Sequence, residues 1–254
     1  MSSLDFAIIG AQKSGTTALA QFLDQHPGVA MANPKETHLF DREGFLFDST
    51  PELIDQSYSA FFDSASVGQV RGEATPIYLY WPDTLVSLHN YRPDLNLIVL
   101  LRDPVDRAIS HYGMEKQRGH EPLSLFHALL KERQRLRDDP FPLKEQSDTR
   151  NHSYRDRGYY SRQLASLYRV FPRKQVLVLD MQDLLTNHDE VLQRVCRFLN
   201  IDEEVSIPQE VVFSGARPSG PSYQLCRMIL KFTYLLEYWR IRKYIDFPVT
   251  SWLW

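Results

Sequence analysis

The sequence predicts an α/β domain in which helices cover a central, mostly parallel sheet. Three short apolar runs, "FAIIG", "LNLIVLL" and "QVLVLD", have the length and composition of strands that are buried on both faces. Segments with apolar residues at helical spacing alternate with them, which is the order that βαβ units produce. With 254 residues, 43% of them hydrophobic, the chain can bury one full core, and we expect residues 1–254 to form a single domain.

The elements follow from local patterns along the chain. The run "FAIIG" leads into a helix that includes "ALAQFL", and a further strand is expected in "GQVRGEA". Asp103 and Pro104 suit the N-cap and first position of a helix, and Asn187 with Glu190 suits a second N-cap. The polar stretch from Asp138 to Asp156 is expected to be a mobile loop. The other expected helices cover residues 82–91, 104–117, 123–137, 159–171 and 187–199.

Composition excludes several classes of function. A formal net charge of −3 and a pI near 6.2 leave no global basic field, so we expect no nucleic-acid partner. Cys196 and Cys226 are too few for a disulfide framework and match no Cys/His metal pattern. The apolar stretch "FAIIGA" is too short for a signal peptide or a membrane span. We therefore expect a cytoplasmic protein that binds no metal.

The stretch "GAQKSGTT" has the composition of a phosphate-binding loop. It joins the first apolar run to the first helix, so backbone N–H groups and the positive helix end point to one place. Lys13 adds a charge, and the hydroxyls of Ser14, Thr16 and Thr17 add donors. A nucleoside-triphosphate loop has its lysine directly after the last glycine, whereas Lys13 comes two residues before Gly15. The stretch predicts a bound phosphate or sulfate group, with an ordinary turn as the alternative.

A second cationic position follows the run "LNLIVLL". Arg102 lies at the carboxyl end of that expected strand, where α/β folds bind ligands, and arginine binds phosphate in bidentate fashion. Ser110 lies two turns into the following helix. The alternative is a structural ion pair between Arg102 and Asp103 or Asp106, and the residues alone do not decide between the two.

Two motifs in matching order carry a resemblance to a known family. "GAQKSGTTAL" resembles the 5′-phosphosulfate loop of sulfotransferases that use 3′-phosphoadenosine 5′-phosphosulfate (PAPS), and "LRDPVDRAISHY" resembles their 3′-phosphate motif. The likeness extends from about residue 5 to about residue 220 and includes "RGYYSRQLASLYRVFPRKQVLVLDMQDL". "PKETHLF" and "RGEATPIYL" are most like the heparan-sulfate and related carbohydrate branch. The resemblance implies a P-loop-type, three-layer α/β fold, PAPS as cofactor, adenosine 3′,5′-bisphosphate as product and no metal.

The resemblance also assigns roles by position. Sulfuryl transfer to an alcohol needs a base, and Glu36 in "PKETHLF" resembles the base of the family. His38 matches a catalytic histidine two residues further on. The alternatives are an exposed Glu36 paired with Lys35, and a structural His38 beside Phe40. The cofactor-binding positions are Lys13 (also catalytic), Ser14, Gly15, Thr16 and Thr17 for the 5′-phosphosulfate, Arg102 and Ser110 for the 3′-phosphate, Tyr160 near the nucleotide, and Ser214, Gly215, Ala216 and Arg217 in a closing loop.

Departures from the family pattern limit what is implied about the acceptor. Heparan-type members commonly have a lysine after the glutamate of the "GEATP" segment, where this chain has Ala74, so either the acceptor geometry differs or Lys35 substitutes. The membrane anchor and C-terminal disulfide of the Golgi members are not visible in the sequence. We expect the acceptor to be a hydroxyl, less readily an amine, of a sugar, glycolipid or small metabolite. Its identity and the oligomeric state do not follow from the residues.

Two other classes of function stay open. A P-loop phosphotransferase or kinase would need lysine directly after the glycine and an acidic Mg²⁺ ligand. A non-catalytic nucleotide-binding module would bind the cofactor and would not depend on Glu36.

Residues 221–245 are expected to form an amphipathic helical segment. Such a helix can lie on a membrane, line an acceptor site or meet a second subunit. We favour packing on the protein's own core, which is the more common role of an apolar helix face. The apolar face contains Leu225, Ile229, Phe232, Leu236 and Trp239, and the cations elsewhere on the segment are Arg227, Lys231, Arg240, Arg242 and Lys243.

Overall fold

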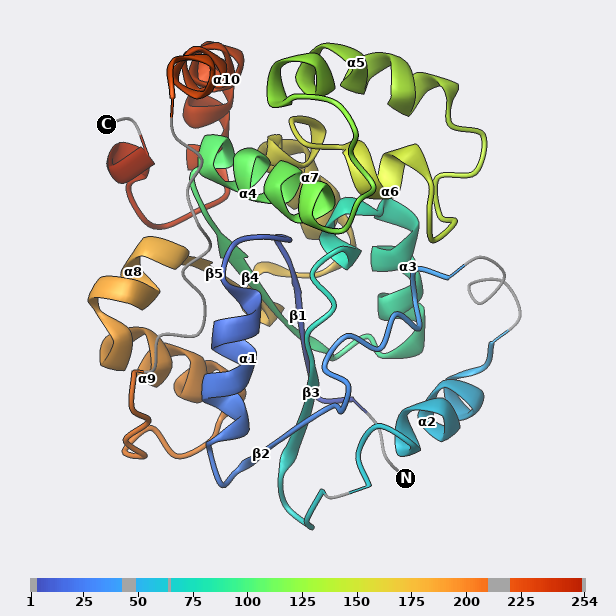
Figure 1. Cartoon of the computed structure of the whole chain (residues 1–254). Helices are drawn as coiled ribbons and strands as arrows, with labels where there is room; N and C mark the ends of the chain where they lie inside the picture. Colours follow the sequence, from blue (N-terminus) through green and yellow to red (C-terminus); the bar gives the residue numbers. More distant parts are fainter. Residues whose placement is uncertain (1–3, 43–48, 64, 210–219, 253–254) are drawn as a thin grey trace. The chain divides into compact units, whose positions relative to one another are not determined.

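Five parallel strands pair in the order β2-β3-β1-β4-β5 (Figure 1). Every residue of β1 is buried, and so is every residue of β4 except Asn96, so the middle of the sheet is covered on both faces. The fold class predicted from the apolar runs is confirmed. The strands are β1 (Phe6–Gly10), β2 (Val29–Met31), β3 (Val70–Glu73), β4 (Asn96–Leu101) and β5 (Val176–Asp180).

The computed structural model describes residues 4–42, 49–63, 65–209 and 220–252, and the chain divides into two compact units. Unit 1 comprises Met1–Leu101 and Leu164–Phe213 and contains the whole sheet. Unit 2 comprises Arg102–Gln163 and Ser214–Trp254. Each unit is described by itself below. The predicted closing loop, Ser214 to Arg217, lies outside the described residues.

In unit 1, α1 and α9 pack on one face of the sheet. Leu23 of α1 and Val195 of α9 belong to the same hydrophobic cluster as Ile8 of β1. Ile9 and Val99, whose side chains point to the opposite face from those of their strand neighbours, are also buried. The helices of unit 1 are α1 (Thr16–Asp24), α2 (Pro51–Ser59), α3 (Pro82–Tyr91), α8 (Met181–Thr186), α9 (His188–Leu199) and the larger part of α7 (Tyr160–Val170).

Unit 2 is helical, and its last helix, α10, packs against α4 and α5. The carboxylate of Glu237 accepts hydrogen bonds from the backbone N and the hydroxyl of Ser161 at 2.6 and 2.7 Å. The hydroxyl of Tyr234 donates to the carbonyl oxygen of Arg155 at 2.8 Å. These bonds join α10 to the first turn of α7 and to the segment that precedes it. The helices are α4 (Pro104–Gln117), α5 (Leu125–Asp138), α6 (Asp148–His152) and α10 (Pro221–Arg240).

Helix starts were predicted with mixed success. The helices expected at 82–91 and 104–117 occur with those bounds, and Asp103 caps the second by accepting from Val105 N at 2.7 Å. Asn187 is the N-cap residue of α9, as predicted, but its side chain makes no cap hydrogen bond, so the capping box expected there is wrong. The reason is that Asn187 also ends α8, where its N–H donates to the carbonyl oxygen of Asp183 at 2.7 Å.

The polar stretch from Asp138 to Asp156 contains helix α6, so the expectation of a mobile loop is wrong for that part. Ser147 caps α6 by accepting from Arg150 N at 3.1 Å, and the Asp139 carboxylate accepts from Thr149 N at 2.7 Å. Polar side chains that bond nearby backbone groups in this way order a segment without apolar burial. The polar residues that indicated a mobile loop are therefore the ones whose hydrogen bonds stabilise this segment.

Helix α10 buries a different face from the one we expected. Cys226, Leu230 and Tyr234 are buried, whereas Phe232 and Trp239 are exposed. The expectation that the Phe232 face packs on the protein's own core is wrong. Within the described ranges, no helix has both the length and the apolar content that crossing a bilayer requires.

The turn between β1 and α1 requires glycine at two positions. Gly15 has φ of 89°, and a Cβ there would lie 3.3 Å from Met181 Cγ and 3.4 Å from Leu100 Cδ2. A Cβ at Gly10 would lie 2.7 Å from Leu79 Cβ, which is closer than two unbonded carbon atoms can approach. The first turn of α1 therefore comes close to β4 and to the start of α8.

Gly15→Ala is expected to lower the free energy of unfolding by more than Gly68→Ala does. Both glycines have positive φ, and placing alanine there costs about 1–2 kcal/mol. Only Gly15 has neighbours within 4 Å of the added methyl group. Urea denaturation of the two variants measures the difference, and equal losses would contradict the close packing of this turn.

Candidate functional site

The start of α1 has the donors that an anion needs. Helix α1 has no side-chain cap and no acidic residue in its first turn, so neither a cap nor a carboxylate competes for its first N–H groups. The hydroxyl of Ser14 is fully buried and makes no hydrogen bond to any described residue. A buried hydroxyl without a partner is costly, and a bound phosphate or sulfate oxygen would satisfy it. The predicted phosphosulfate loop therefore fits the group that it is expected to hold.

The loop that carries Glu36 and His38 is fixed to the carboxyl end of β3 and the residues that follow it. Ala74 N donates to the carbonyl oxygen of Lys35 at 2.8 Å, and Thr37 N donates to the hydroxyl oxygen of Thr75 at 3.1 Å. The hydroxyl of Thr37 donates to the Glu73 carboxylate. Thr37 lies between the two predicted catalytic residues, so these bonds fix the backbone on both sides of it.

The Glu73 carboxylate is fully buried, and hydroxyl groups surround it. In addition to Thr37, it accepts from Tyr58 at 2.5 Å and from Thr75 at 2.8 Å. Burial raises the pKa of Glu73, although the hydrogen bonds from these hydroxyls oppose the shift. Its position inside unit 1 and its three donors make Glu73 a support of the loop, in a place that an acceptor hydroxyl cannot reach without rearrangement.

Glu36 and His38 belong to a chain of charged groups at the surface of unit 1. Lys35 Nζ lies 2.5 Å from Glu36 Oε1, and His38 Nε2 lies 3.4 Å from Glu36 Oε2. On its other side, His38 Nδ1 lies 3.0 Å from Oδ2 of the buried Asp41. The histidine thus lies between two carboxylates, and it has φ of 53°, which is uncommon for a residue other than glycine.

This arrangement shifts both titrations. Burial opposes ionisation of Glu36, but the hydrogen bond from His38 and the charge of Lys35 outweigh it and lower the pKa of Glu36 to about 2. Burial also disfavours the charged form of His38, but the hydrogen bonds to Asp41 and Glu36 outweigh it and raise the pKa of His38 to about 9. At neutral pH, Glu36 is ionised and His38 is protonated.

Sequence reasoning did not identify Asp41, Thr37 or Tyr58 as part of this site. Asp41 follows His38 by three residues in "THLFD", so a carboxylate next to the histidine was available as a signal. Tyr58 gave no signal, because only the fold brings it to Glu73. Ala74 is fully buried in the core, and Lys35 is the lysine that lies beside Glu36.

In unit 2, a hydrogen bond joins the side chain of Tyr160 to the backbone of Arg102. The hydroxyl of Tyr160 donates to the carbonyl oxygen of Arg102 at 3.0 Å, and the rest of the tyrosine is buried. Arg102 Nη2 lies 4.0 Å from Asp106 Oδ2, so the ion pair that we considered as the alternative is present as a long contact. Ser110 lies on α4 and is half-buried.

Arg227 of α10 was not predicted as a site residue, and its guanidinium pairs with the Asp106 carboxylate. Burial opposes its charge, but the Asp106 carboxylate outweighs that effect and raises the pKa of Arg227. Asp106 therefore contacts two arginines, and its contact with Arg227 is the closer one. The nearby Asp103 has a pKa of about 6, because burial and the charge of Asp106 outweigh its hydrogen bond from Val105 N.

The predicted residues are thus grouped within each unit. Lys13 to Thr17 form one turn of unit 1, and Glu36 and His38 are in contact in the same unit. Arg102, Ser110 and Tyr160 belong to unit 2. Among the described residues, no group of histidine, cysteine, aspartate and glutamate is arranged to hold a metal ion.

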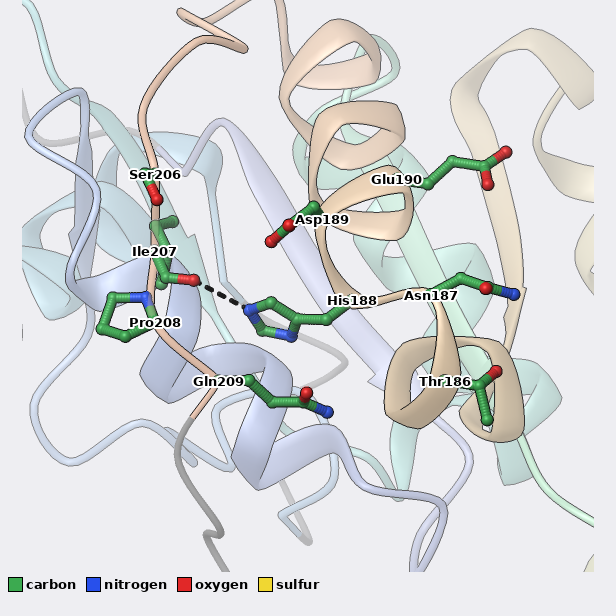
Figure 2. A pocket seen from close by; sticks show the side chains of 9 residues that line it. All are labelled: Thr186, Asn187, His188, Asp189, Glu190, Ser206, Ile207, Pro208 and Gln209. Atoms are coloured by element: carbon green, nitrogen blue, oxygen red, sulfur yellow. Dashed lines mark hydrogen bonds between the residues drawn. The ribbon is translucent and has the colours of Figure 1, made fainter.

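A surface hollow in unit 1 contains none of the predicted site residues (Figure 2). Residues 186–190 and 206–209 line it. His188 Nε2 donates to the carbonyl oxygen of Ile207 at 2.9 Å, and Asp189 and Glu190 stand at the start of α9. Two carboxylates at a helix start repel an anion, so this hollow does not fit a phosphosulfate.

Comparison with known proteins agrees with the motifs. A family model described as the sulfotransferase domain matches residues 3–214. The chain is 32% identical over 201 residues to heparan sulfate glucosamine 3-O-sulfotransferase 6 of Mus musculus, covering 78% of this chain and 53% of that protein. It is 28% identical over 213 residues to the bifunctional heparan sulfate N-deacetylase/N-sulfotransferase 3 of the same species, covering 83% and 24%.

A solved structure is similar over nearly the whole chain. The sulfotransferase from Alicyclobacillus acidocaldarius matches with a TM-score of 0.81 and 27% identity, covering 99% of each chain. The curated relatives are longer, and the chain spans about half of the first of the two mouse proteins and about a quarter of the second.

His38→Asn is expected to destabilise the protein near pH 6 and to have little effect near pH 10. The pKa of His38 is about 9 in the fold against 6.5 ordinarily, so its charge stabilises fully below 6.5 and that contribution is lost as pH rises through 9. Because 35% of the side chain is exposed, the effect should be about 1 kcal/mol or less. Asparagine tolerates the positive φ. Urea denaturation of both proteins across this range is the measurement, and a pH-independent difference would refute the coupling.

Proposed function

This chain belongs to the sulfotransferase family, and we propose that it transfers a sulfuryl group from PAPS to a hydroxyl group of an acceptor. The observation that carries the proposal is the start of α1, where a buried, unsatisfied Ser14 hydroxyl and an uncapped helix end offer donors to an anion. An acidic and basic cluster built around Glu36 supplies the second requirement, which is a group that takes the proton of the acceptor.

We propose that the predicted cofactor positions have the roles expected of them. Lys13 to Thr17 would bind the 5′-phosphosulfate, and Arg102 and Ser110 would bind the 3′-phosphate. Support for Arg102 comes from the hydrogen bond between Tyr160 and its carbonyl oxygen, which fixes its backbone, and from Asp106, which lies closer to Arg227 than to Arg102. Tyr160 is a positioning residue in this proposal, and Ser214 to Arg217 keep their expected role in closing the site.

The proposed reaction breaks the bond between sulfur and the bridging phosphate oxygen and forms a bond between sulfur and the acceptor oxygen. The acceptor proton passes to Glu36, and adenosine 3′,5′-bisphosphate leaves. A carboxylate with a pKa of about 2 is a weak base. The proton therefore transfers as the new bond forms, when the acceptor oxygen has become acidic. Lys13 would stabilise the negative charge that grows on the leaving phosphate.

His38 and Lys35 are assigned to the orientation and charge of Glu36. His38 is held by Asp41 and contacts Glu36, so it fixes the carboxylate from one side. Lys35 contacts it from the other side and takes the place of the lysine that heparan-type members have where this chain has Ala74. A lysine at 74 would have to leave the core in which Ala74 is buried.

For the acceptor we propose a carbohydrate, a glycolipid or a small metabolite, with a hydroxyl preferred over an amine. Support comes from the matched mouse proteins, whose names refer to heparan sulfate and to its glucosamine. A cytoplasmic location is likewise a proposal, and it is consistent with Cys196 and Cys226 being unbridged and buried. The family model covers parts of both units, which supports the single sulfotransferase domain that we propose.

Transfer of label from PAPS to a component of a host extract tests the proposed function. Activity is expected to persist when Mg²⁺ is chelated, whereas a kinase would stop. A nucleotide-binding module would bind adenosine 3′,5′-bisphosphate and yield no labelled product.

Glu36→Gln is expected to lower kcat by roughly 10²–10⁴-fold, because glutamine keeps the shape of the side chain and removes its basicity. Glu203→Gln is the matched control, since Glu203 is 40% exposed and pairs with Arg197 at 2.8 Å. Calorimetry with adenosine 3′,5′-bisphosphate checks folding and cofactor affinity. Turnover by Glu36→Gln within a few-fold of the parent would remove Glu36 as the base.

Arg102→Ala is expected to reduce the preference for PAPS over adenosine 5′-phosphosulfate, which lacks the 3′-phosphate. A hydrogen bond to a charged group is worth about 1.5–3 kcal/mol, so roughly one to two decades of the kcat/KM ratio should be lost. Arg162→Ala, which removes an exposed arginine paired with Asp156, is the control. If Arg102→Ala discriminates as well as the parent, the 3′-phosphate binds elsewhere.

A further inference from the structure

One face of α10 anchors the helix in unit 2. Cys226, Leu230 and Tyr234 are buried, and Glu237 bonds Ser161 through both of its carboxylate oxygens. Arg227 on the same side pairs with Asp106 of α4. These contacts fix the rotation of the helix about its axis, so the residues on its other face have a defined position.

The opposite face of α10 is apolar and exposed. At 3.6 residues per turn, its large side chains fall within an arc of about 100°. Each of them is between 47% and 73% exposed. Isolated exposed apolar residues are ordinary, but a contiguous stripe along a whole helix indicates an interaction surface. The stripe consists of Leu225, Met228, Phe232, Leu235, Leu236 and Trp239.

Within residues 221–243, cations border this stripe and no exposed acidic residue does. Lys231 lies along one edge and Arg240 along the other, and Arg242 and Lys243 follow the end of the helix. Lys243 Nζ lies 5.3 Å from the centre of the Trp239 ring. Glu237 is the one acidic residue in positions 221–243, and it is buried against Ser161.

We propose that this face of α10 binds an anionic lipid surface, with the helix lying in the plane of the interface. Leucine, phenylalanine and tryptophan would enter the boundary between headgroups and acyl chains, and the flanking cations would meet lipid phosphates. The charge pattern disfavours a second copy as the occupant. A two-fold contact through the same face would bring the cationic borders of both helices together. This proposal does not depend on the sulfotransferase activity.

Flotation with lipid vesicles tests the proposal on the full chain. We expect the protein to float with vesicles of equal amounts of phosphatidylglycerol and phosphatidylcholine and to float much less with phosphatidylcholine alone. The double variant Phe232→Ser/Trp239→Ser and the double variant Arg240→Gln/Arg242→Gln should each weaken the binding about tenfold or more. Added salt should weaken binding of the parent.

Matched controls distinguish binding through this face of α10 from nonspecific adsorption to the vesicles. Val86→Ser/Leu185→Ser removes exposed apolar side chains of α3 and α8, and Arg169→Gln/Lys174→Gln removes exposed cations of unit 1. These variants should bind like the parent, and all variants should unfold at the parent's temperature because the altered side chains are exposed.

Failure of the parent to float with anionic vesicles would overturn the proposal, as would equal losses in the controls. A concentration-dependent dimer that Phe232→Ser/Trp239→Ser abolishes, without flotation of the parent, would assign the face to self-association instead.

Discussion

The buried carboxylate of Glu73 is the group on which the geometry around Glu36 depends. A carboxylate without water needs donors, and three hydroxyls from Thr37, Tyr58 and Thr75 provide them. Because one of those hydroxyls belongs to Thr37, satisfying the buried charge also places the residues on either side of it. The half-buried cluster of Lys35, Glu36 and His38 thus takes its position from a polar contact inside the core.

The sequence predicted the parts of the fold that local physics determines. Runs such as "LNLIVLL" form buried strands because they are apolar on both faces. Asp103 followed by Pro104 starts a helix for reasons contained in the two residues. It did not predict β2 or α8, because three and six residues carry too little periodicity. The membership of Tyr58 in the Glu73 network depends on how α2 packs in the folded chain, which no local pattern encodes.

The buried face of α10 and the pKa values around Glu36 could not be predicted either, because both depend on contacts that form only in the folded chain. Helix α10 has apolar residues on both sides, so periodicity shows an amphipathic helix without showing which side is covered. The buried side includes Tyr234 and Glu237, whose polar groups are satisfied by backbone and hydroxyl groups of other segments. The strongly shifted pKa values of Glu36 and His38 likewise could not be read from spacing. The folded loop brings His38 and Lys35 to Glu36, and it brings Asp41 and Glu36 to His38.

If the turn before α1 binds an anion as proposed, the conformational stability of this protein would depend on its solution as well as on its sequence, because the buried Ser14 hydroxyl has no described partner. Any small oxyanion that enters the turn repays the desolvation of that hydroxyl only in the folded chain, since the unfolded chain has no such turn. Buffers that contain sulfate or phosphate would therefore act as ligands. A melting temperature recorded in such a buffer would describe the anion-bound form. Melting temperatures from different laboratories could then be compared only when the buffers contain the same anion at the same concentration.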